Sequence, residues 1–465
     1  MMRSLFSGVS GLQNHQTRMD VIGNNIANVN TTGFKGNRVN FQDIFYQQLQ
    51  GAARPTETLG GVNPREVGLG MTVAAIDTVH TQGAFQSTGI GTDLAIQGMG
   101  FFILDDRGTQ LYTLAGAFSL DRDGTLVNPA NGMKVQGWMA QEIGGRQYLD
   151  TSRSIEDLII PVGAKDEARA TSMVYFASNL DKRIPELPDG ATPEEIAMGA
   201  WSTSINIYDS FGDIHVLEVE FTRVPGVNNS WQGQVYVNRN ADIPTNASAG
   251  LGELPPEAGG ASIFTVNFNN QGTLLSAVDA VGNESTAGQV IMNVAFDVQS
   301  ATPGDDGEMV RQVFQLNMGQ VGGLVNSMTQ YAERSSMKIF EQNGNSMGYM
   351  ENFRIDGSGT ITGIFDNGTT RILGQVALAS FANQGGLEKA GDNTFRRTNN
   401  SGNAMIDASG VAGKGRIIAG ALEMSNIDMA DQFTDMIITQ RGFQASSRTI
   451  QTADQLLQEL LTLKR

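Results

Sequence analysis

The side chains best suited to acid–base or metal chemistry in this chain are its three histidines, His15, His80 and His215. The first falls on an expected N-terminal helix, and the other two fall within strand-like runs. A metal site normally shows ligands at short, regular spacing, and no such spacing surrounds these residues. We therefore interpret the histidines as structural residues and expect no metal site.

A short acidic segment, Asp121-Arg122-Asp123-Gly124, is the nearest approach to a calcium loop. An EF-hand loop needs a further Asp or Asn two residues earlier and a Glu six residues beyond the Gly, where this chain has Ser119 and Ala130. The segment therefore predicts a hairpin turn, in which Gly124 tolerates a positive φ. Carboxylates distant in the chain can still converge as a glycosidase pair, although no particular pair is indicated.

The motifs of common catalytic sites are missing. The sequence has no G-x-S-x-G elbow, no G-x-x-x-x-G-K-[ST] phosphate loop, no G-x-G-x-x-G and no H-E-x-x-H. It also has no cysteine, which excludes disulfides, thiolate metal sites and cysteine nucleophiles. We therefore predict no catalytic residue, no cofactor and no enzymatic activity.

The composition limits the class of protein and its partners. The 465 residues suffice for about three domains, and 56 glycines with only 17% charged residues favour β domains rich in tight turns. A net charge of -17 argues against nucleic acid and anionic membranes as partners. We expect no Sec-type signal peptide, and no apolar run is long enough to insert into a membrane.

The two ends of the chain carry matching apolar stripes at helical spacing. Apolar residues recur at intervals of 3, 4 or 7, as in a heptad repeat, at Leu5, Val9, Leu12, Met19, Ile22, Ile26 and Val29, and again at Met429, Phe433, Met436, Phe443, Ile450, Leu457 and Leu461. Gln440, Ser447 and Asp454 interrupt the C-terminal stripe. They either fix the register of a coiled coil or face solvent or a channel.

Two such helices bury few apolar groups relative to the entropy lost in ordering them, so neighbours are expected. Copies of the same chain would give a head-to-tail assembly, which becomes an open helix if the rotation does not close. The alternative is that the ends pack as ordinary surface helices on the chain's own β domains. The pattern alone leaves both interpretations open.

Between its ends the chain reads as β structure, and the predicted fold class is α+β, mainly β, with nested discontinuous domains. Residues 1–30 and 420–465 are the expected terminal coiled-coil helices, and residues 31–70 are an extended connector punctuated by Gly and Pro. Alternating strands separated by turns predict a first β domain over 71–165 and 343–419, with a second, outer β domain over 166–342 inserted into it.

The terminal segments carry a resemblance. Residues 4–35 and 420–465 closely resemble the N- and C-terminal signatures of bacterial flagellar rod and hook proteins. Residues 203–224 resemble the inserted outer domain of hook proteins, and residues 355–395 resemble the hook segment that follows it. Distal rod proteins are shorter and lack this insertion, so the chain is identified as a member of the hook group; residues 224–337 match only loosely.

A further resemblance points to spirochaete hook proteins. Residues 161–183 are similar to the region in which those proteins join neighbouring subunits by a lysinoalanine bond, formed when a Lys amine adds to dehydroalanine made from Cys. Lys165 stands at the lysine position and Asn179 at the neighbouring Asn, but Ser178 stands where the family has Cys. Hydroxide leaves less readily than sulfide, and a Lys amine is mostly protonated. We therefore expect little or no crosslinking.

The resemblance implies a structural subunit that assembles with itself into a short, curved, flexible tube joining rod to filament. The terminal helices, disordered in the free chain, would order into an inner coiled-coil layer around an export channel. Its partners would be rod, hook-cap and hook-filament junction proteins and the flagellar type III export apparatus, with the polymer outside the cytoplasm. The expected core contacts are Leu12, Met19, Ile22, Ile26, Phe433, Met436, Phe443, Ile450 and Leu457.

Two alternatives remain from the sequence. A distal rod or hook-filament junction subunit belongs to the same structural class, and the inserted β domain argues against the rod protein. A secreted β-domain hydrolase, with helical ends used only for export, belongs to a different class. Converging carboxylates in a pocket and measurable hydrolysis would favour the hydrolase.

Overall fold

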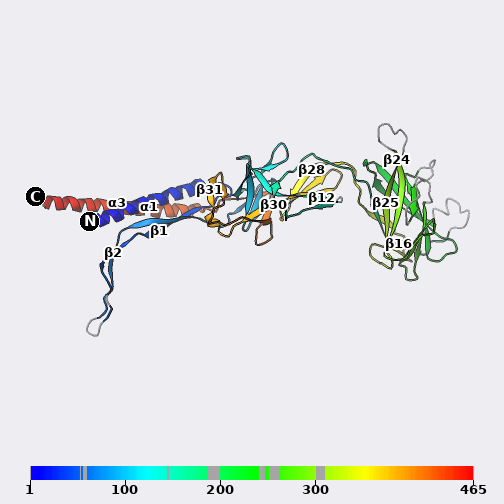
Figure 1. Cartoon of the computed structure of the whole chain (residues 1–465), viewed down its shortest axis with the longest axis horizontal. Helices are drawn as coiled ribbons and strands as arrows, with labels where there is room; N and C mark the ends of the chain where they lie inside the picture. The colour runs from blue at the N-terminus through cyan, green and yellow to red at the C-terminus, as the bar shows by residue number, and fades with distance from the viewer. Residues whose placement is uncertain are drawn as a thin grey trace. The chain divides into compact units, whose positions relative to one another are not determined.

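The computed structural model describes residues 2–52, 54–55, 60–143, 146–186, 199–239, 247–250, 262–299 and 309–463. By its contacts the chain divides into two compact units. Unit 1 comprises Met1–Val162, Glu351–Ile364 and Thr370–Arg465, and unit 2 comprises Gly163–Met350 and Phe365–Thr369. The chain thus leaves unit 1, forms unit 2 and returns, which confirms the predicted nested, mainly β fold with a helix at each end (Figure 1). The domain limits stated above remain a prediction.

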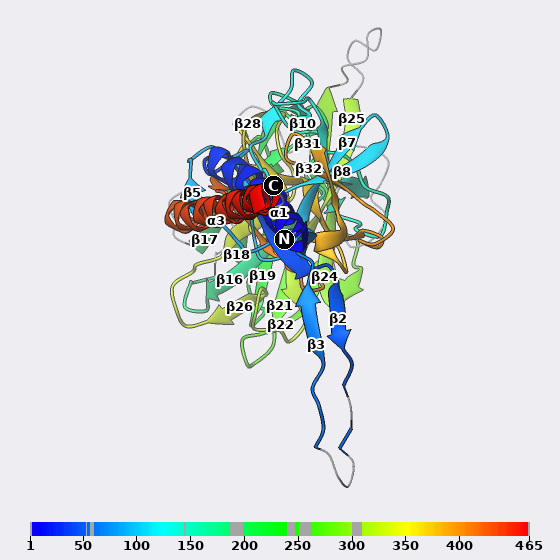
Figure 2. The same cartoon turned by 90° about the vertical axis from the view of Figure 1, so that its left-hand side faces the viewer.

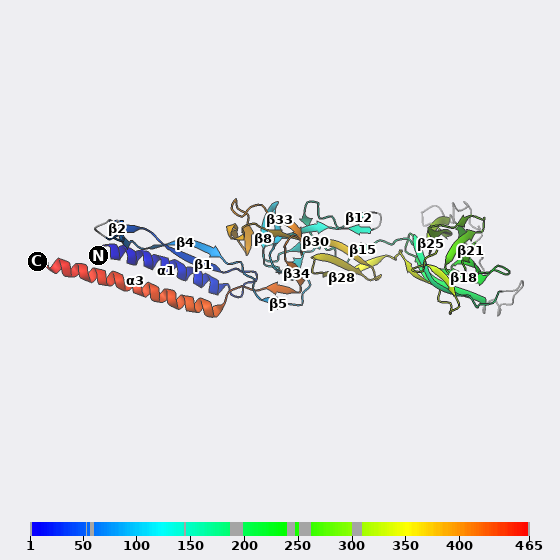
Figure 3. The same ribbon diagram turned by 90° about the horizontal axis from the view of Figure 1, so that it is seen from below.

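Unit 1 begins and ends with a long helix. The helices are α1 (Met2–Ala27) and α3 (Met429–Leu463), and Figures 1 and 3 both show them side by side. The strands of the N-terminal part are β1 (Asn37–Asp43), β2 (Tyr46–Gln50), β3 (Arg65–Gly68), β4 (Met71–Thr78), β5 (Phe85–Ser87), β6 (Leu94–Gln97), β7 (Phe101–Asp106), β8 (Thr109–Thr113), β9 (Ser119–Leu120), β10 (Leu126–Val127), β11 (Lys134–Met139), β12 (Gln141–Ile143), β13 (Arg146–Tyr148) and β14 (Glu156–Asp157).

The returning chain adds strands to the same sheets. They are the later part of β28 (Gly348–Ile355), β29 (Thr360–Phe365), β30 (Thr370–Ser380), β31 (Glu388–Gly391), β32 (Thr394–Arg396), β33 (Met405–Ala408), β34 (Arg416–Ala419) and β35 (Ala421–Glu423), with a short 3-10 turn η1 (Gln384–Gly386). The main sheet runs β29-β30-β11-β7-β8-β32-β31. Its core is aromatic: Phe101 makes edge contacts with Phe381 and Phe395, and Tyr112 makes one with Phe381. Edge-to-face aromatic pairs of this kind are favoured by the ring quadrupoles.

Unit 2 is a sandwich of two sheets. Its strands are β15 (Lys165–Asp166), β16 (Met173–Asp181), β17 (Ala200–Tyr208), β18 (Ile214–Arg223), β19 (Ser230–Val237), β20 (Ala247–Gly250), β21 (Ile263–Phe268), β22 (Leu274–Asp279), β23 (Glu284–Ser285), β24 (Gln289–Gln299), β25 (Met309–Gln320), β26 (Met328–Tyr331) and β27 (Lys338–Gln342). One sheet has the order β20-β24-β25-β16-β26 and the other β17-β18-β19-β21-β22-β23. The alternating apolar residues of both meet in one core around Trp231, Phe221 and Phe314.

A five-residue hairpin turn recurs along the chain. An Asp or Asn begins each turn, its Oδ1 accepts the backbone N–H groups two and four residues later, and a Gly with positive φ stands at the fourth position; the turns start at Asp209, Asn269, Asp279 and Asp356. Such side-chain bonds to the following backbone stabilise tight turns. Asp121 also starts a hairpin, with Gly124 at φ +78°, so the turn predicted there is confirmed.

Two segments differ from the sequence-based description. Residues 31–70, the predicted connector, form β1, which pairs with β4, and β2, which pairs with β3. The C-terminal helix begins at Met429 and not at 420, because β35 pairs with β5 and Asp428 caps the helix by accepting the Ala430 N–H at 2.7 Å. The sequence did not predict β2 and β3 because both strands are exposed along their whole length, so they have no alternation of buried apolar and exposed polar residues.

Candidate assembly interface

Helices α1 and α3 pack in antiparallel fashion through small residues. A Cβ built on Gly8 would lie 2.9 Å from Ile450, one on Gly11 would lie 2.9 Å from Ser446, and one on Gly442 would lie 2.8 Å from the His15 ring. These distances are shorter than Cβ contacts in real structures, so side chains of each helix pack directly on the glycines of the other. The absence of a Cβ at these glycines makes room for Ile450, Ser446 and the His15 ring between the two helices.

Polar pairs continue the same contact toward the N-terminal end of α3. Arg18 donates to Asp435 at 3.0 Å, and the Asn25 amide donates to Gln432 at 3.0 Å. Asn25 is almost fully buried, and Thr439, which lies between Asp435 and Gly442 on α3, has no exposed surface. The helix pair is therefore aligned by specific polar partners as well as by small residues.

The line of contact is displaced from the apolar stripe on both helices. On α1 it passes through Gly8, Gly11, His15, Arg18 and Asn25, and on α3 through Gln432, Asp435, Gly442 and Ser446. Leu12, Met19, Ile26, Phe433, Met436 and Phe443 each stand one residue after a member of these lines. One residue is a rotation of about 100° around a helix. Most of the expected core residues thus point away from the partner helix of the same chain.

The expected core residues differ in exposure. Leu12, Met19, Ile26, Met436, Phe443, Ile450 and Leu457 are partly buried, Phe433 is 48% exposed, and Ile22 is buried at 4%. Ile450 contacts Gly8 of its own chain, and Ile22 lines a cavity described below. Further apolar residues of α3 are exposed, including Ile437 at 52% and Ile438 at 56%. The structure thus brings Ile22 and Ile450 into contacts within the chain and leaves Phe433 open.

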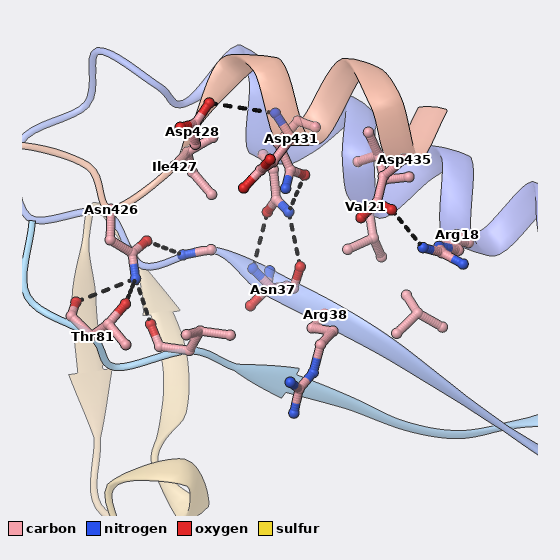
Figure 4. Close-up of a pocket in the computed structure, with 16 residues that line it drawn as sticks. Arg18, Val21, Asn37, Arg38, Thr81, Asn426, Ile427, Asp428, Asp431 and Asp435 are labelled. Carbon is pink, nitrogen blue, oxygen red and sulfur yellow. Dashed lines mark hydrogen bonds and ion pairs between the residues drawn. The ribbon is translucent and has the colours of Figure 1, made fainter. Parts of the chain in front are cut away.

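A cavity of about 240 Å³ lies where the helix pair meets β1 (Figure 4). Two amide side chains, Asn25 and Asn426, line it. Asn25 donates to the Asn37 carbonyl at 2.8 Å and accepts its N–H at 3.0 Å, while Asn426 accepts the Gly36 N–H at 2.9 Å and donates to the Val79 carbonyl at 2.8 Å. Each amide therefore accepts one backbone N–H and donates to one backbone carbonyl, as the backbone of a neighbouring strand would do. No apolar pattern marks these residues, and sequence reasoning missed them.

Next to this cavity a buried ion pair joins the segment just before β1 to the end of β35. Lys35 Nζ lies 2.7 Å from Glu423 Oε1, with 4% and 2% of the side chains exposed. Lys35 also donates to the Thr81 carbonyl, and Glu423 accepts the Gly83 N–H. The pair has the extra hydrogen bonds that a buried charge needs. Its members are 388 positions apart, so only the fold reveals it.

His15 lies within the helix interface and not on a free surface. Its ring packs on Gly442 and makes an edge contact with Phe41 at 5.9 Å, and its Nδ1 is buried without a hydrogen-bond partner. Burial, followed by the charge of Arg18, lowers the pKa of His15 below its usual 6.5. The ring therefore stays neutral at pH 7 in the folded helix pair.

Both ring nitrogens of His215 lie within hydrogen-bond distance of a polar side chain. His215 Nε2 lies 3.1 Å from Asp209, and Nδ1 lies 2.8 Å from the Asn238 amide. Both ring nitrogens are therefore occupied, which leaves neither one to accept a proton from a substrate. Among the residues that the structure describes, no group of three or more His, Asp or Glu side chains is arranged to hold a metal ion, and no helix is long and apolar enough to cross a membrane.

Comparison with known proteins decides which family this architecture represents. Family models match residues 5–35 (flagella basal body rod protein), 95–172 (flagellar hook protein FlgE/F/G D1 domain), 179–345 (flagellar basal body protein FlaE D2 domain) and 418–463 (flagellar basal body rod FlgEFG protein C-terminal). The flagellar hook protein FlgE of Treponema pallidum is 57% identical over the full length of both chains, and that of Borreliella burgdorferi is 52% identical over the full length of both.

The chain belongs to the flagellar hook protein family. Both relatives are spirochaete proteins, so the resemblance to spirochaete hook proteins is confirmed. A solved structure, the hook protein FlgE2 of Helicobacter pylori, is 14% identical with a TM-score of 0.49, covering 73% of this chain and all of that one.

In this hook protein family member Lys165, Ser178 and Asn179 all lie in unit 2. Lys165 is exposed, with Nζ 5.8 Å from the centre of the Tyr349 ring. Ser178 lies in β16 with φ +106°, a conformation that L residues rarely adopt. The Asn179 amide donates to the Glu333 carbonyl at 3.0 Å and accepts the Tyr331 N–H at 2.7 Å. Asn179 therefore holds the segment after β26 against β16.

Proposed function

We propose that this chain is the structural subunit of a bacterial flagellar hook, which polymerises into a curved, flexible tube. The tube transmits torque from rod to filament and encloses the export channel. The observation that supports this most directly is the displaced helix contact. Because α1 and α3 meet through Gly8, Gly11 and Gly442, their apolar stripes are left for other molecules. In a polymer those molecules are further copies of the chain.

The terminal helices form the inner layer of the tube in this proposal. Of the nine core residues expected from the sequence, Leu12, Met19, Ile26, Phe433, Met436, Phe443 and Leu457 supply the contacts between copies, whereas Ile22 and Ile450 pack within the chain. Phe433 and Ile437 lie about half exposed on α3, which matches a surface awaiting a partner. Gly442 and Ser446 bring the two helices of one subunit together, so the pair acts as one building block.

A second surface awaits neighbours at the β2–β3 hairpin. Figure 2 shows β2 and β3 as a two-stranded ribbon, and they form a sheet of their own. Phe45, Tyr46 and Leu49 are 71%, 58% and 60% exposed. A two-stranded hairpin is at best marginally stable in water. Packing against adjacent subunits would remove these side chains from water and hold the hairpin in place.

The β domain over 71–165 and 343–419 and the inserted β domain over 166–342 form the outer layers of the tube. Rod, hook-cap and hook-filament junction proteins are its flanking partners, and the flagellar type III apparatus exports it. The place of action is the hook of the basal body. The relatives are named as hook proteins, which are structural, and this disfavours the secreted hydrolase. The same names also disfavour a rod or hook-filament junction subunit.

Electron microscopy of the concentrated, purified chain tests the proposal. We expect curved tubes from the full chain and none from a version lacking residues 1–30 and 425–465. Monodisperse particles from both, even after seeding with hook fragments, would contradict self-assembly through the terminal helices.

A matched pair of substitutions refines this test. Phe433→Ser removes an exposed apolar group from the stripe, whereas Gln444→Ser changes an exposed polar residue on the same helix. We expect Phe433→Ser to raise the concentration needed for polymerisation at least tenfold and Gln444→Ser to leave it unchanged. Neither should alter the unfolding of the subunit, because both positions are exposed. Equal effects of the two substitutions would contradict a role for the stripe.

A further inference from the structure

The chain contains three Asn–Gly dipeptides, Asn131–Gly132, Asn343–Gly344 and Asn367–Gly368, and the structure describes all of them. Asparagine is a labile residue, because the backbone nitrogen of the next residue can attack its side-chain carbonyl carbon and expel ammonia. Glycine favours this attack, since it has no side chain to hinder the approach. The surroundings of each amide then decide which site reacts in the folded protein.

The amide of Asn343, which follows β27 in unit 2, lies against the beginning of β16. Its Oδ1 accepts two successive backbone N–H groups, those of Ser172 and Met173, both at 2.9 Å. Its Nδ2 donates to Ser172 Oγ at 2.7 Å. Two N–H donors on one carbonyl oxygen stabilise the negative charge that develops there when a nucleophile attacks the carbon. The Ser172 hydroxyl lies beside the nitrogen that would leave.

The backbone at Gly344, which supplies the attacking nitrogen, is packed closely on its neighbours. Its N–H donates to the side chain of Gln342, with Oε1 at 2.6 Å. A Cβ built on Gly344 would lie 2.8 Å from the Thr171 backbone nitrogen, so only glycine fits this space. The fold therefore requires at this position the one residue that hinders the attack least.

The other two Asn–Gly pairs lie in tight turns. The N–H groups of Gly132 and Gly368 donate to main-chain carbonyls of the same turns, at 2.8 Å and 3.0 Å. Both glycines have a positive φ, of +71° and +79°. In each pair the Asn Oδ1 accepts the backbone N–H two residues later. These turns must open before the glycine nitrogen can attack, and opening them costs their hydrogen bonds.

The surroundings of Asn343 also suit the product of the reaction. A carboxylate at this position keeps both backbone N–H donors, and the Ser172 hydroxyl can rotate to donate to it as well. At Asn367 the opposite holds. Its Nδ2 donates to the Ser346 carbonyl at 2.8 Å and lies 3.5 Å from Asp166 Oδ2, so a carboxylate there would face two oxygens and a like charge.

We propose that Asn343 is a site of spontaneous deamidation in the folded protein, and that the fold accepts the resulting aspartate. The Gly344 nitrogen loses its proton and bonds to Asn343 Cγ, the Cγ–Nδ2 bond breaks, and Nδ2 takes up a proton and leaves as ammonia. Water then opens the cyclic imide at either carbonyl, which gives an aspartyl or an isoaspartyl residue. Asn343 is exposed, so water reaches it.

The reaction takes place within one subunit, so the inference does not depend on the proposed function. It exchanges one amide for one carboxylate and adds a negative charge to a chain whose net charge is already -17. The new charge lies in unit 2, between β27 and β28.

Incubation of the folded chain in water enriched in 18O tests the proposal, because opening of the imide incorporates one oxygen from the solvent. Digestion in ordinary water and mass spectrometry then compare residues 131, 343 and 367 in one sample. We expect at least fivefold more label at residue 343 than at either other site. The chain unfolded in guanidinium chloride is the control, in which the three sites should be labelled to within about twofold of each other.

Four results would overturn the proposal. They are equal labelling of the three sites in the folded chain, greater labelling at residue 131 or 367, no label at any site, and the same excess at residue 343 in the unfolded chain. In the last case the local sequence and not the fold would be responsible.

Removal of one hydroxyl tests the geometry of the site. Ser172→Ala deletes the group next to the leaving nitrogen and should lower the labelling of residue 343 at least threefold. Labelling of residues 131 and 367 should not change, which controls for a general effect on folding. Unchanged labelling at residue 343 would overturn the assigned role of the Ser172 hydroxyl.

A matched pair of substitutions tests whether the fold accepts the product. Asn343→Asp should unfold at the same concentration of denaturant as the original chain or at a higher one, because the carboxylate keeps its donors. Asn367→Asp should unfold at a lower concentration, because it places a second carboxylate beside Asp166. Tryptophan fluorescence measures both midpoints. Equal destabilisation by the two substitutions would contradict the accommodation of aspartate at residue 343.

Discussion

Lys35 and Glu423, 388 positions apart in the chain, form an ion pair of 2.7 Å with almost no exposed surface. Lys35 follows the segment that leaves α1, and Glu423 precedes the segment that enters α3. The pair therefore ties together the two strands of chain that lead to the helices. Because a buried charge without its partner is costly, neither segment is expected to take its native position alone.

Removal of one member of this pair should be severe. We expect Lys35→Met to lower the free energy of unfolding of unit 1 by about 3–5 kcal/mol, since Glu423 is left buried without a counter-charge. Urea unfolding followed by circular dichroism measures the change. The exposed pair Lys134–Asp157 is the control, and Lys134→Met should leave the unfolding midpoint in place. Equal midpoints for both variants would show that Lys35 contributes no more than a surface charge.

A side chain larger than glycine at residue 442 should separate the helices. A Cβ at this position meets the His15 ring at 2.8 Å, so Gly442→Val should destabilise the helix pair by about 1–3 kcal/mol. Gly23→Ala on α1 is the control, because nothing lies within 4 Å of the added methyl group. There we expect slight stabilisation from helix propensity. The helical circular dichroism signal of the polymer during heating measures the stability of both variants. Loss of helix in the Gly23→Ala chain would contradict the packing described.

Acidification should weaken the helix pair through His15. Burial, with a contribution from Arg18, lowers its pKa below 6.5, so the unfolded chain binds a proton more readily than the folded one. The contribution of neutral His15 to the free energy of unfolding is therefore complete above pH 6.5, and it is lost as the pH drops from 6.5 toward the lowered pKa. His15→Gln should reduce this loss, as measured by thermal unfolding of the polymer at pH 7.5 and pH 5.5.

A second histidine requires a control in the same experiment. Burial, then the charges of Lys35 and Lys389, also lowers the pKa of His80. His80→Gln should make the β part of unit 1 less sensitive to acid. It should not change the acid sensitivity of the helical circular dichroism signal. If His15→Gln leaves the acid response of the helical signal unchanged, another group is responsible.

Glycine should be more stable than serine at residue 178. Relief of the positive φ, worth about 1–2 kcal/mol, exceeds the entropic cost of glycine in a strand, so Ser178→Gly should stabilise unit 2 by about 0.5–1 kcal/mol. Ala177→Gly, one residue earlier in β16, should destabilise it. Chemical denaturation of the two variants, read by tryptophan fluorescence, gives the comparison. Destabilisation of both would mean that Ser178 carries no strain.

Crosslinking of subunits through Ser178 should be absent or very slow. Formation of dehydroalanine from Ser requires loss of water, which is a poorer elimination than loss of sulfide from Cys. Denaturing electrophoresis of the polymer should give single subunits, and peptide mass spectrometry should find residues 165 and 178 unmodified. A Lys165–Ser178 lysinoalanine peptide would contradict this expectation.

Local patterns predicted the elements of the fold well where each pattern has one structural solution. The heptad spacing marked both terminal helices, and the turn at Asp121 followed from its Gly and from the alternating strands beside it. The β2 and β3 strands were missed because no face of that hairpin is buried, so no alternation is imposed on it.

The candidate interface was predicted only in part. Apolar periodicity identified a stripe on each helix, but it did not identify the line along which α1 meets α3. Gly8 and Gly442 carry no hydrophobic signal, although Ile450 and the His15 ring pack directly on them. Asn25 and Asn426 are likewise inconspicuous until the fold places backbone groups beside their amides.

The sequence by itself determined the helical ends, the β character between them, the nested order of the units and the family, because these depend on periodicity and on long matched segments. The tertiary structure decided which face of each helix is used within the chain and which remains for neighbours. It also decided that Lys35 meets Glu423. The physical reason is that close approach and buried pairing depend on distances between residues hundreds of positions apart, which no local pattern encodes.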